Sequence, residues 1–384
     1  MTEIAAKSLC VSAKEVLVCS TGRIGVPMPM ANVKRGIVTA SQLLSSGAAR
    51  AREVAEAIMT TDTRRKEIAV EFEIGGARVR LGGICKGAGM IQPGMSRTGK
   101  RPAAGLHATM LGFITTDAVV EPAVLKDALE SAVAQSFNRI TVDGDMSTND
   151  TVLILANGLA GNSPIGGARL RRAGRSTPNI APVFCSRRPA GDAASVVGRD
   201  SLRTAKRLQK KLDRVSPYQD ADLFQRALNF VTLELAKMIV RDGEGVTRFI
   251  TLHVHGARSA SDAEAVARSV ANSALVKTSF FGGDPNWGRV LCALGYSSAR
   301  VDETKVDVGY SPAGKREITF ALRRGQPTKM ALRTLAKIAA ADEFDLHIFL
   351  HAGSHDSVLY TCDLTEEYVE FNKGNVSDPK SLGG

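Results

Sequence analysis

The sequence predicts a mixed α/β fold, because two kinds of hydrophobic periodicity alternate along its 384 residues. Apolar residues recur at helical spacing from Pro122 onward and over 220–245, whereas 68–84 and 248–257 alternate between apolar and polar side chains. Hydrophobic residues make up 44% of the chain, enough for one large core or two moderate ones. No apolar run approaches the ~20 residues of a membrane-spanning helix, so we expect a cytoplasmic protein without membrane contact.

The first 60 residues are predicted to be mostly helical. The opening residues form an amphipathic helix, Val16–Cys19 form a short strand, and one long helix runs from about Val38 to Met59. The loop after Cys19 contains Thr21 and Gly22. Because glycine lets a ligand approach the backbone closely, this pair could stabilise a developing oxyanion; an ordinary glycine-rich turn is the alternative.

The middle of the chain predicts a hairpin and a helix. Gly75 and Gly76 separate the two alternating segments, as the turn of a β-hairpin does. A helix begins at Pro122, a residue that favours the first helical position. Residues 140–158 then predict a strand, a polar turn and a second strand.

The C-terminal half predicts a long helix over 220–245, with Gly243 as its C-cap, followed by smaller αβ elements. Ser261 and Glu264 have the spacing of a capping box for the next helix. Further strands are expected near four residues: Val306, Ile318, His347 and Val358.

Two histidines of the strand over 248–257 share one face. His253 and His255 are two residues apart, so their side chains point the same way. Paired histidines can bind a metal, but the sequence pattern offers no third ligand, so a solvent-facing surface is the favoured interpretation and no metal is predicted.

The net charge of +11 is concentrated in two segments, 169–214 and a short run that contains Arg97, Lys100 and Arg101. Residues 169–214 hold thirteen Lys or Arg against three Asp. We therefore do not expect the folded body to bind nucleic acid, although a basic RNA-binding or scaffolding protein that uses this segment is an alternative from another class. The six cysteines contain no CxxC pair, which indicates reduced core residues rather than a zinc site.

Thr109 is the candidate nucleophile. A threonine hydroxyl reacts poorly unless a base lies beside it, and cleavage of the chain between Ala108 and Thr109 would supply the freed α-amine of Thr109 as that base. The alternative is a threonine that merely opens the buried apolar run Met110–Ile114.

The neighbouring motifs favour the first interpretation. KGAGMI at 86–91, ATMLGFITTDA at 108–118, DGEG at 242–245, the block at 273–290 and the tail at 362–377 occur in this order. Together they resemble the ornithine acetyltransferase family, the bifunctional glutamate N-acetyltransferases of arginine biosynthesis. The resemblance covers about residues 1–95, 108–163 and 218–377.

This resemblance implies a layered, self-processing αββα architecture of the N-terminal-nucleophile type, with a smaller C-terminal αβ domain. It implies that Thr109 becomes a new N-terminus and carries an acetyl group from N-acetylornithine to glutamate. Thr21 and Gly22 would form the oxyanion hole. It implies no cofactor, acetyl-CoA as a second donor, and an assembly of two α and two β fragments.

The resemblance also implies a set of substrate-binding residues: Thr61, Lys86, Thr109, Glu244, Asn372 and Ser377. Read without it, Thr61 belongs to a polar strand entry, Lys86 is a solvated lysine and Glu244 is a surface turn residue. Asn372 and Ser377 would then belong to a frayed tail.

We expect a catalytic domain over 1–255 and an αβ domain over 256–384, with insertions near 96–107 and 165–217. Met1 corresponds to a position inside the family's α chain, and the first insertion lies next to the predicted cleavage position. A family member that is unprocessed and inactive is therefore the main alternative.

Overall fold

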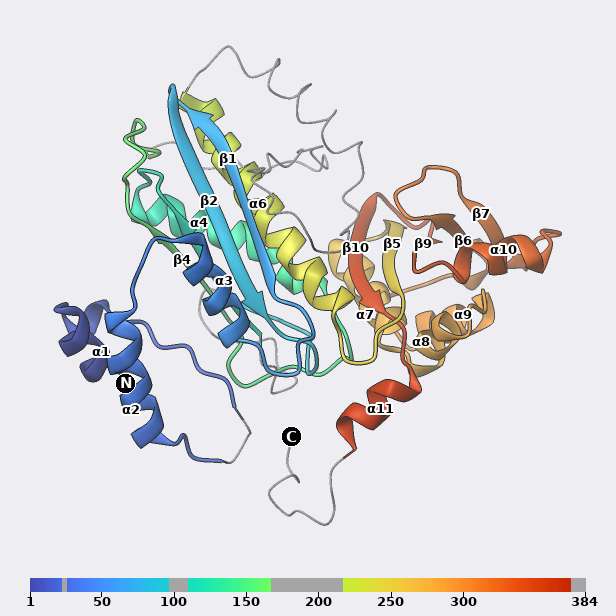
Figure 1. Cartoon of the computed structure of the whole chain (residues 1–384). Coiled ribbons are helices and arrows are strands. Elements are labelled where there is room, and N and C mark those ends of the chain that lie inside the picture. Colours follow the sequence, from blue (N-terminus) through green and yellow to red (C-terminus); the bar gives the residue numbers. More distant parts are fainter. Residues whose placement is uncertain (23–25, 97–109, 167–216, 374–384) are drawn as a thin grey trace, which may run out of the picture.

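The computed structural model describes residues 1–22, 26–96, 110–166 and 217–373. Within these ranges the body consists of two β-sheets, and helices pack against each sheet (Figure 1). Each sheet has its own cluster of buried apolar side chains. The predicted mixed α/β class is confirmed. The basic segment 169–214 lies outside the described residues, so the alternative that depends on it stays a prediction.

The first sheet has the strand order β1-β2-β3-β4. Its strands are β1 (Lys66–Ile74), β2 (Ala77–Lys86), β3 (Leu111–Thr116) and β4 (Thr151–Ala156). The predicted hairpin is confirmed, because β1 pairs antiparallel with β2 and both Gly75 and Gly76 have positive φ angles, 56° and 81°. β3 pairs antiparallel with β2 and parallel with β4.

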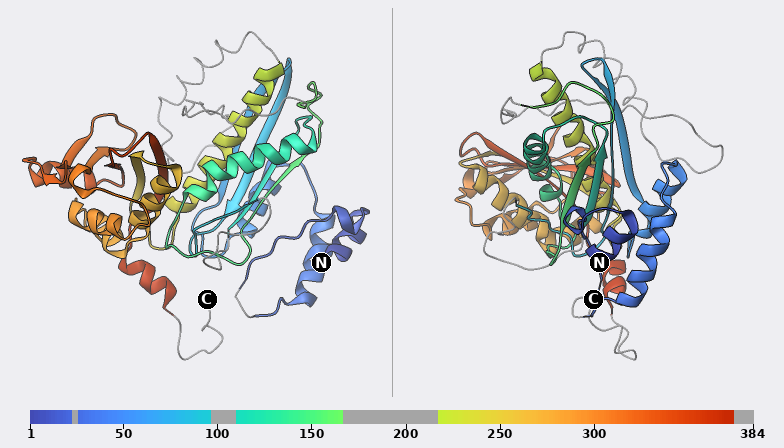
Figure 2. Two further views of the ribbon diagram at one scale, coloured as in Figure 1. Left: turned by 180° about the vertical axis from the view of Figure 1, so that it is seen from behind. Right: turned by 90° about the vertical axis from the view of Figure 1, so that its left-hand side faces the viewer.

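Two long helices contribute to the apolar core that packs on this sheet. The predicted helices are confirmed as α4 (Pro122–Gln135) and α6 (Pro217–Arg241). α6 packs on β1 and β2, and α4 packs on α6 (Figure 2). The apolar stripe of α6 is fully buried at Leu228, Val231 and Leu235. The short helix η2 (Phe137–Arg139) follows α4.

The second sheet has the order β10-β5-β9-β6-β7-β8. Its strands are β5 (Phe249–Ala257), β6 (Asp307–Pro312), β7 (Thr319–Arg323), β8 (Gln326–Pro327), β9 (Glu343–Phe349) and β10 (His355–Cys362). These strands include the four expected near Val306, Ile318, His347 and Val358. β5 lies between β10 and β9 and runs parallel to β9.

Shorter helices accompany the second sheet. They are α7 (Ala260–Asn272), α8 (Ala274–Phe281), α9 (Trp287–Gly295), η3 (Glu303–Lys305), α10 (Leu332–Ala339) and α11 (Glu366–Asn372). α7 packs on β5 and β10. The predicted capping box of α7 is wrong, because the helix begins earlier and Ser259, not Ser261, accepts the hydrogen bond from Asp262 N.

The N-terminal elements differ from the prediction. They are α1 (Thr2–Leu9), η1 (Ala13–Glu15), α2 (Met30–Gln42) and α3 (Ala48–Ala57), and α1 and α2 pack on each other at the end of the molecule away from the second sheet (Figure 1). The single helix expected over Val38–Met59 is wrong, since the Ser45-Ser46-Gly47 run breaks it. Val16–Cys19 is not a strand.

One further strand is shorter than predicted. Before the polar turn at 143–149, only Ile140 forms a bridge, to Tyr360 of β10. This bridge ties the segment after η2 to the second sheet, and Thr141 N also donates to Tyr360 O at 3.0 Å. Among the helices of the described ranges, none combines the length and the apolar character needed to cross a membrane.

Candidate active site

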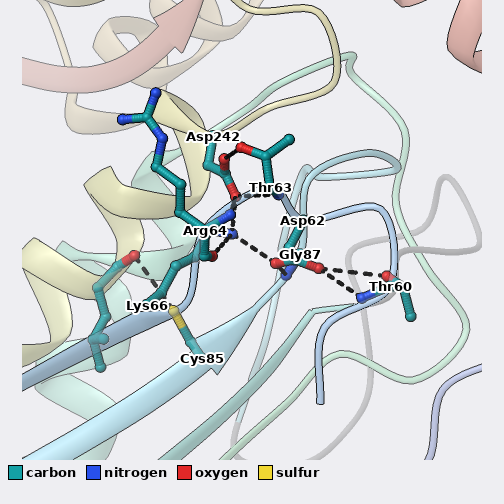
Figure 3. A network of polar contacts seen from close by, with 9 residues as sticks. Thr60, Asp62, Thr63, Arg64, Lys66, Cys85, Gly87 and Asp242 are labelled. Carbon is teal, nitrogen blue, oxygen red and sulfur yellow. Dashed lines mark hydrogen bonds and ion pairs between the residues drawn. The ribbon is translucent and has the colours of Figure 1, made fainter. Parts of the chain in front are cut away.

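A buried charge network lies where the first sheet meets the end of α6. Lys66 Nζ lies 2.6 Å from Asp62 Oδ1 and 2.5 Å from Asp242 Oδ2, and all three side chains are at most 4% exposed (Figure 3). The network therefore joins the loop before β1 to the residue after α6.

Backbone groups complete this network. Asp62 also accepts hydrogen bonds from the N–H of Gly87 at 2.7 Å and of Thr60 at 3.0 Å. Asp242 accepts from the N–H of Thr63 at 3.1 Å. Burial acts to raise the pKa of Asp62, but the charge of Lys66 and these donors outweigh it, so the pKa lies below its ordinary value.

The network fixes the positions of three predicted substrate-binding residues. Thr61 lies between Thr60 and Asp62, Lys86 precedes Gly87, and Glu244 follows Asp242 by two residues. Each of these residues is thus within two positions, in sequence, of a group that the network holds. The sequence does not reveal this network, because Thr60–Thr63 looks like an ordinary polar entry to a strand.

Lys86 is a buried cation. Its exposed fraction is 2%, so the alternative of a solvated lysine is wrong. Burial lowers the pKa of Lys86, while the carboxylates of Asp62, Glu244 and Asp150 act to raise it. Lys86 ends β2 and pairs with Leu111 at the start of β3, so it lies beside the strand that follows the predicted nucleophile.

Glu244 lies between two other motifs. Its backbone N–H donates to Ala88 O at 2.9 Å, and its Oε2 accepts from Asn372 Nδ2 of α11 at 3.0 Å. A Cβ atom at Gly89 would lie 2.5 Å from the Glu244 carboxylate, so only glycine fits there without displacing it. Three predicted residues from distant parts of the sequence, Lys86, Glu244 and Asn372, are therefore gathered around the KGAGMI loop.

Asp143 holds this loop from the other side. Its carboxylate accepts from Met90 N at 2.5 Å and from Ile91 N at 3.0 Å. Tyr368 of α11 donates its hydroxyl to Asp143 at 3.4 Å. Burial raises the pKa of Asp143. The carboxylate therefore supports both the loop and α11 through hydrogen bonds.

Thr109 and Ala108 lie outside the described residues, as does Ser377. The next residue, Met110, is fully buried, and its N–H donates to Asp150 Oδ1 at 2.9 Å. The adjacent Asn149 donates its side-chain amide to Ser20 O. The Asn149-Asp150 pair thus contacts the sequence neighbours of both Thr109 and Thr21.

The predicted oxyanion residues lie at the edge of this region. Thr21 is partly buried, whereas Gly22 is exposed. Among the described residues, no heavy atom lies within 4 Å of a Cβ built at Gly22. The contacts that place the Thr21-Gly22 loop are therefore those of Ser20 with Asn149 and of Cys19 with Thr151.

Comparison with known proteins agrees with the motifs. The model of the ArgJ family matches residues 1–375. The chain belongs to the ArgJ family. The ArgJ-family chain is 41% identical over 373 residues to the arginine biosynthesis bifunctional protein ArgJ of Symbiobacterium thermophilum, covering 97% of this chain and 75% of that protein.

Two further relatives of this ArgJ-family chain are informative. It is 38% identical over 376 residues to the glutamate N-acetyltransferase of Methanocaldococcus jannaschii, covering 97% of this chain and 77% of that protein. A crystal structure of the Bacillus halodurans ArgJ protein covers 70% of this chain and 99% of its own, with 31% identity and a TM-score of 0.49. The expected resemblance is confirmed, and the chain is a member of an acyltransferase family of arginine biosynthesis.

Proposed function

We propose that the protein transfers an acetyl group from N-acetylornithine to glutamate through an acetyl-Thr109 intermediate. The observation that carries this proposal is the meeting of Lys86, Glu244 and Asn372 beside the start of β3, which begins two residues after Thr109. A cation and a carboxylate close together complement the carboxylate and ammonium groups of an amino acid. Met110 N–H, held by Asp150, fixes the backbone next to the nucleophile.

The chemistry follows from a new N-terminus at Thr109. Its α-amine, with an ordinary pKa of about 7.7–8.0, can accept the proton of the Thr109 hydroxyl near neutral pH. The oxygen then attacks the acetyl carbonyl, and ornithine leaves with its amine protonated. The amine of glutamate attacks the resulting ester, which yields N-acetylglutamate and restores the hydroxyl. No cofactor takes part in either step of this proposal.

Each remaining residue has a role in the same proposal. Thr21 and Gly22 donate to the developing oxyanion. Lys86 binds the substrate carboxylate, Glu244 binds the ammonium group, and Asn372 orients Glu244. Thr61 and Ser377 contact the substrate. Acetyl-CoA serves as a second acetyl donor, two α and two β fragments assemble, and the protein acts in the cytosol.

Acetyl transfer from radiolabelled N-acetylornithine tests the proposal. With the wild type we expect label in N-acetylglutamate. When glutamate is omitted, we expect the label to stay on the β fragment, the part of the chain that begins at Thr109. The Lys86→Met variant should lose transfer while keeping its fold.

An unprocessed chain that transfers no label would support the alternative of an inactive family member. RNA binding that falls steeply with salt, and disappears on deletion of 169–214, would support the scaffold alternative.

A further inference from the structure

Three histidines meet on one face of the second sheet. Alternation along β5 places His253 and His255 on this face, while Leu252 and Val254 point into the core on the other. β9 runs parallel to β5, and His347 is the direct partner of His253 in the register. One ring nitrogen from each histidine lies within 4.8 Å of the others. The structure thus supplies the third imidazole that the sequence pattern did not.

The spacing of two of these nitrogens suits a metal ion. His255 Nε2 lies 3.3 Å from His347 Nδ1. Two imidazole nitrogens that bind a tetrahedral zinc ion at about 2.0–2.1 Å are themselves about 3.3 Å apart. This pair therefore already has the separation of two ligands, and side-chain rotations of the three nearly parallel rings would direct their nitrogens to one ion.

His347 has the environment of a metal ligand. Its Nε2 lies 3.0 Å from the hydroxyl of Ser311, which is fully buried on β6. Metal-binding histidines usually direct their second ring nitrogen to such an oxygen, which fixes the tautomer. When Nε2–H donates to Ser311, the lone pair of Nδ1 is left to face His255.

Burial favours neutral imidazoles, the form that can bind a cation. Burial, together with the charges of His253 and His255, lowers the pKa of His347 to about 4. Burial and His253 also lower the pKa of His255, against the charge of Asp356. Among the described residues, His253 Nε2 is buried without a hydrogen-bond partner, and the Asp345 carboxylate lies 3.8 Å from it.

We propose that His253, His255 and His347 bind one divalent transition-metal ion, with zinc as the best fit, and so cross-link β5 to β9. Imidazole nitrogens suit zinc, which accepts a tetrahedral site without further geometric demands. The fourth position is left for water, and Asp345 lies near enough to balance part of the added charge. The site lies in the second sheet and does not depend on the acetyl-transfer proposal.

Equilibrium dialysis of the untagged full chain against micromolar zinc chloride tests this site. We expect one zinc ion per chain in the wild type and at least tenfold weaker binding in both His255→Gln and His347→Gln. Ser311→Ala should weaken binding by roughly tenfold, since it removes the partner that fixes the tautomer. The matched control is His351→Gln, because His351 is half exposed and pairs with Asp307 instead.

Two further measurements keep the test decisive. The Cys10→Ser/Cys292→Ser variant should bind as the wild type does, because these exposed thiols are not part of the site. X-ray absorption of the zinc-loaded wild type should show imidazole nitrogens at about 2.0–2.1 Å, without the sulfur shell at about 2.3 Å. Absence of bound zinc, a sulfur shell, or unchanged binding in His255→Gln would each overturn the proposal.

Discussion

The carboxylate of Asp150 accepts a hydrogen bond from the backbone N–H of Met110, with a distance of 2.9 Å between Oδ1 and N. Met110 is buried, and its carbonyl accepts from Thr151 N at 3.0 Å. Both backbone polar groups of Met110 therefore form hydrogen bonds with consecutive residues, Asp150 and Thr151. The backbone immediately after Thr109 is held at both its donor and its acceptor, as precise positioning of a nucleophile requires.

Replacing Asp150 should disturb this arrangement. Asp150→Ala leaves the buried N–H of Met110 without its acceptor, which costs about 1–3 kcal/mol of unfolding free energy. Acetyl transfer should fall with it. Asp150→Asn keeps an oxygen at Oδ1 and should recover most of the stability. Urea unfolding of the three proteins measures the difference, and equal losses in both variants would show that the charge, rather than this hydrogen bond, matters.

The charge network predicts strong destabilisation by loss of Lys66. Lys66→Met removes the cation that pairs with the buried carboxylates of Asp62 and Asp242, which costs about 3–5 kcal/mol. Arg65→Ala is the matched control. Arg65 forms ion pairs with Glu56 and Glu67, but it is 41% exposed, so its loss should cost less than about 1 kcal/mol. Denaturant midpoints compare the two, and similar shifts would contradict a stabilising role for the buried network.

Acid should weaken the same network in a defined way. The folded-state pKa of Asp62 is lowered, so its contribution to stability is present above the unfolded value of 3.8 and is lost as pH falls through the folded pKa. Asp62→Asn should therefore flatten the decline in unfolding free energy below pH 3.8. The exposed Asp302 also has a lowered pKa, through Thr304 and Lys305, but solvent screens it, so Asp302→Asn should leave the decline unchanged.

Gly89 tests the placement of Glu244. An alanine there would put a methyl group 2.5 Å from the Glu244 carboxylate, which must then move. We expect Gly89→Ala to fold but to raise the KM for glutamate about tenfold, the size of one lost charged hydrogen bond. Gly36→Ala is the control, because its added methyl group meets no atom within 4 Å among the described residues. An unchanged KM in Gly89→Ala would remove Glu244 from substrate binding.

The long periodic elements could be predicted from the sequence. α4 begins at Pro122, α6 follows a continuous apolar stripe, and the Gly75-Gly76 pair marks the hairpin. In these segments the conformational preference of the residues and the pattern of buried side chains indicate the same secondary structure. The prediction of one helix over Val38–Met59 was wrong because it relied on the apolar spacing alone. The Ser45-Ser46-Gly47 run ends the helix locally.

The site could be predicted only in part. Short motifs placed Lys86, Glu244 and Asn372 near one another through the family resemblance, and the structure gathers them around one loop. The partners that hold them there are far apart in sequence: Lys66 and Asp242 are separated by 176 positions. His347 likewise joins His255 only because β9 pairs with β5. Contacts of this kind depend on strand order, which periodicity does not determine.

The proposed acetyl transfer requires cleavage of the chain before Thr109, which intact-mass measurement of the purified protein detects. The wild type should give two fragments whose masses sum to that of the chain plus one water, divided between Ala108 and Thr109. Thr109→Ala should give one uncleaved chain, whereas Thr109→Ser, which keeps the hydroxyl, should still be cleaved. A single full-length mass for the wild type, or cleavage of Thr109→Ala at the same bond, would rule out Thr109 as the self-processing nucleophile.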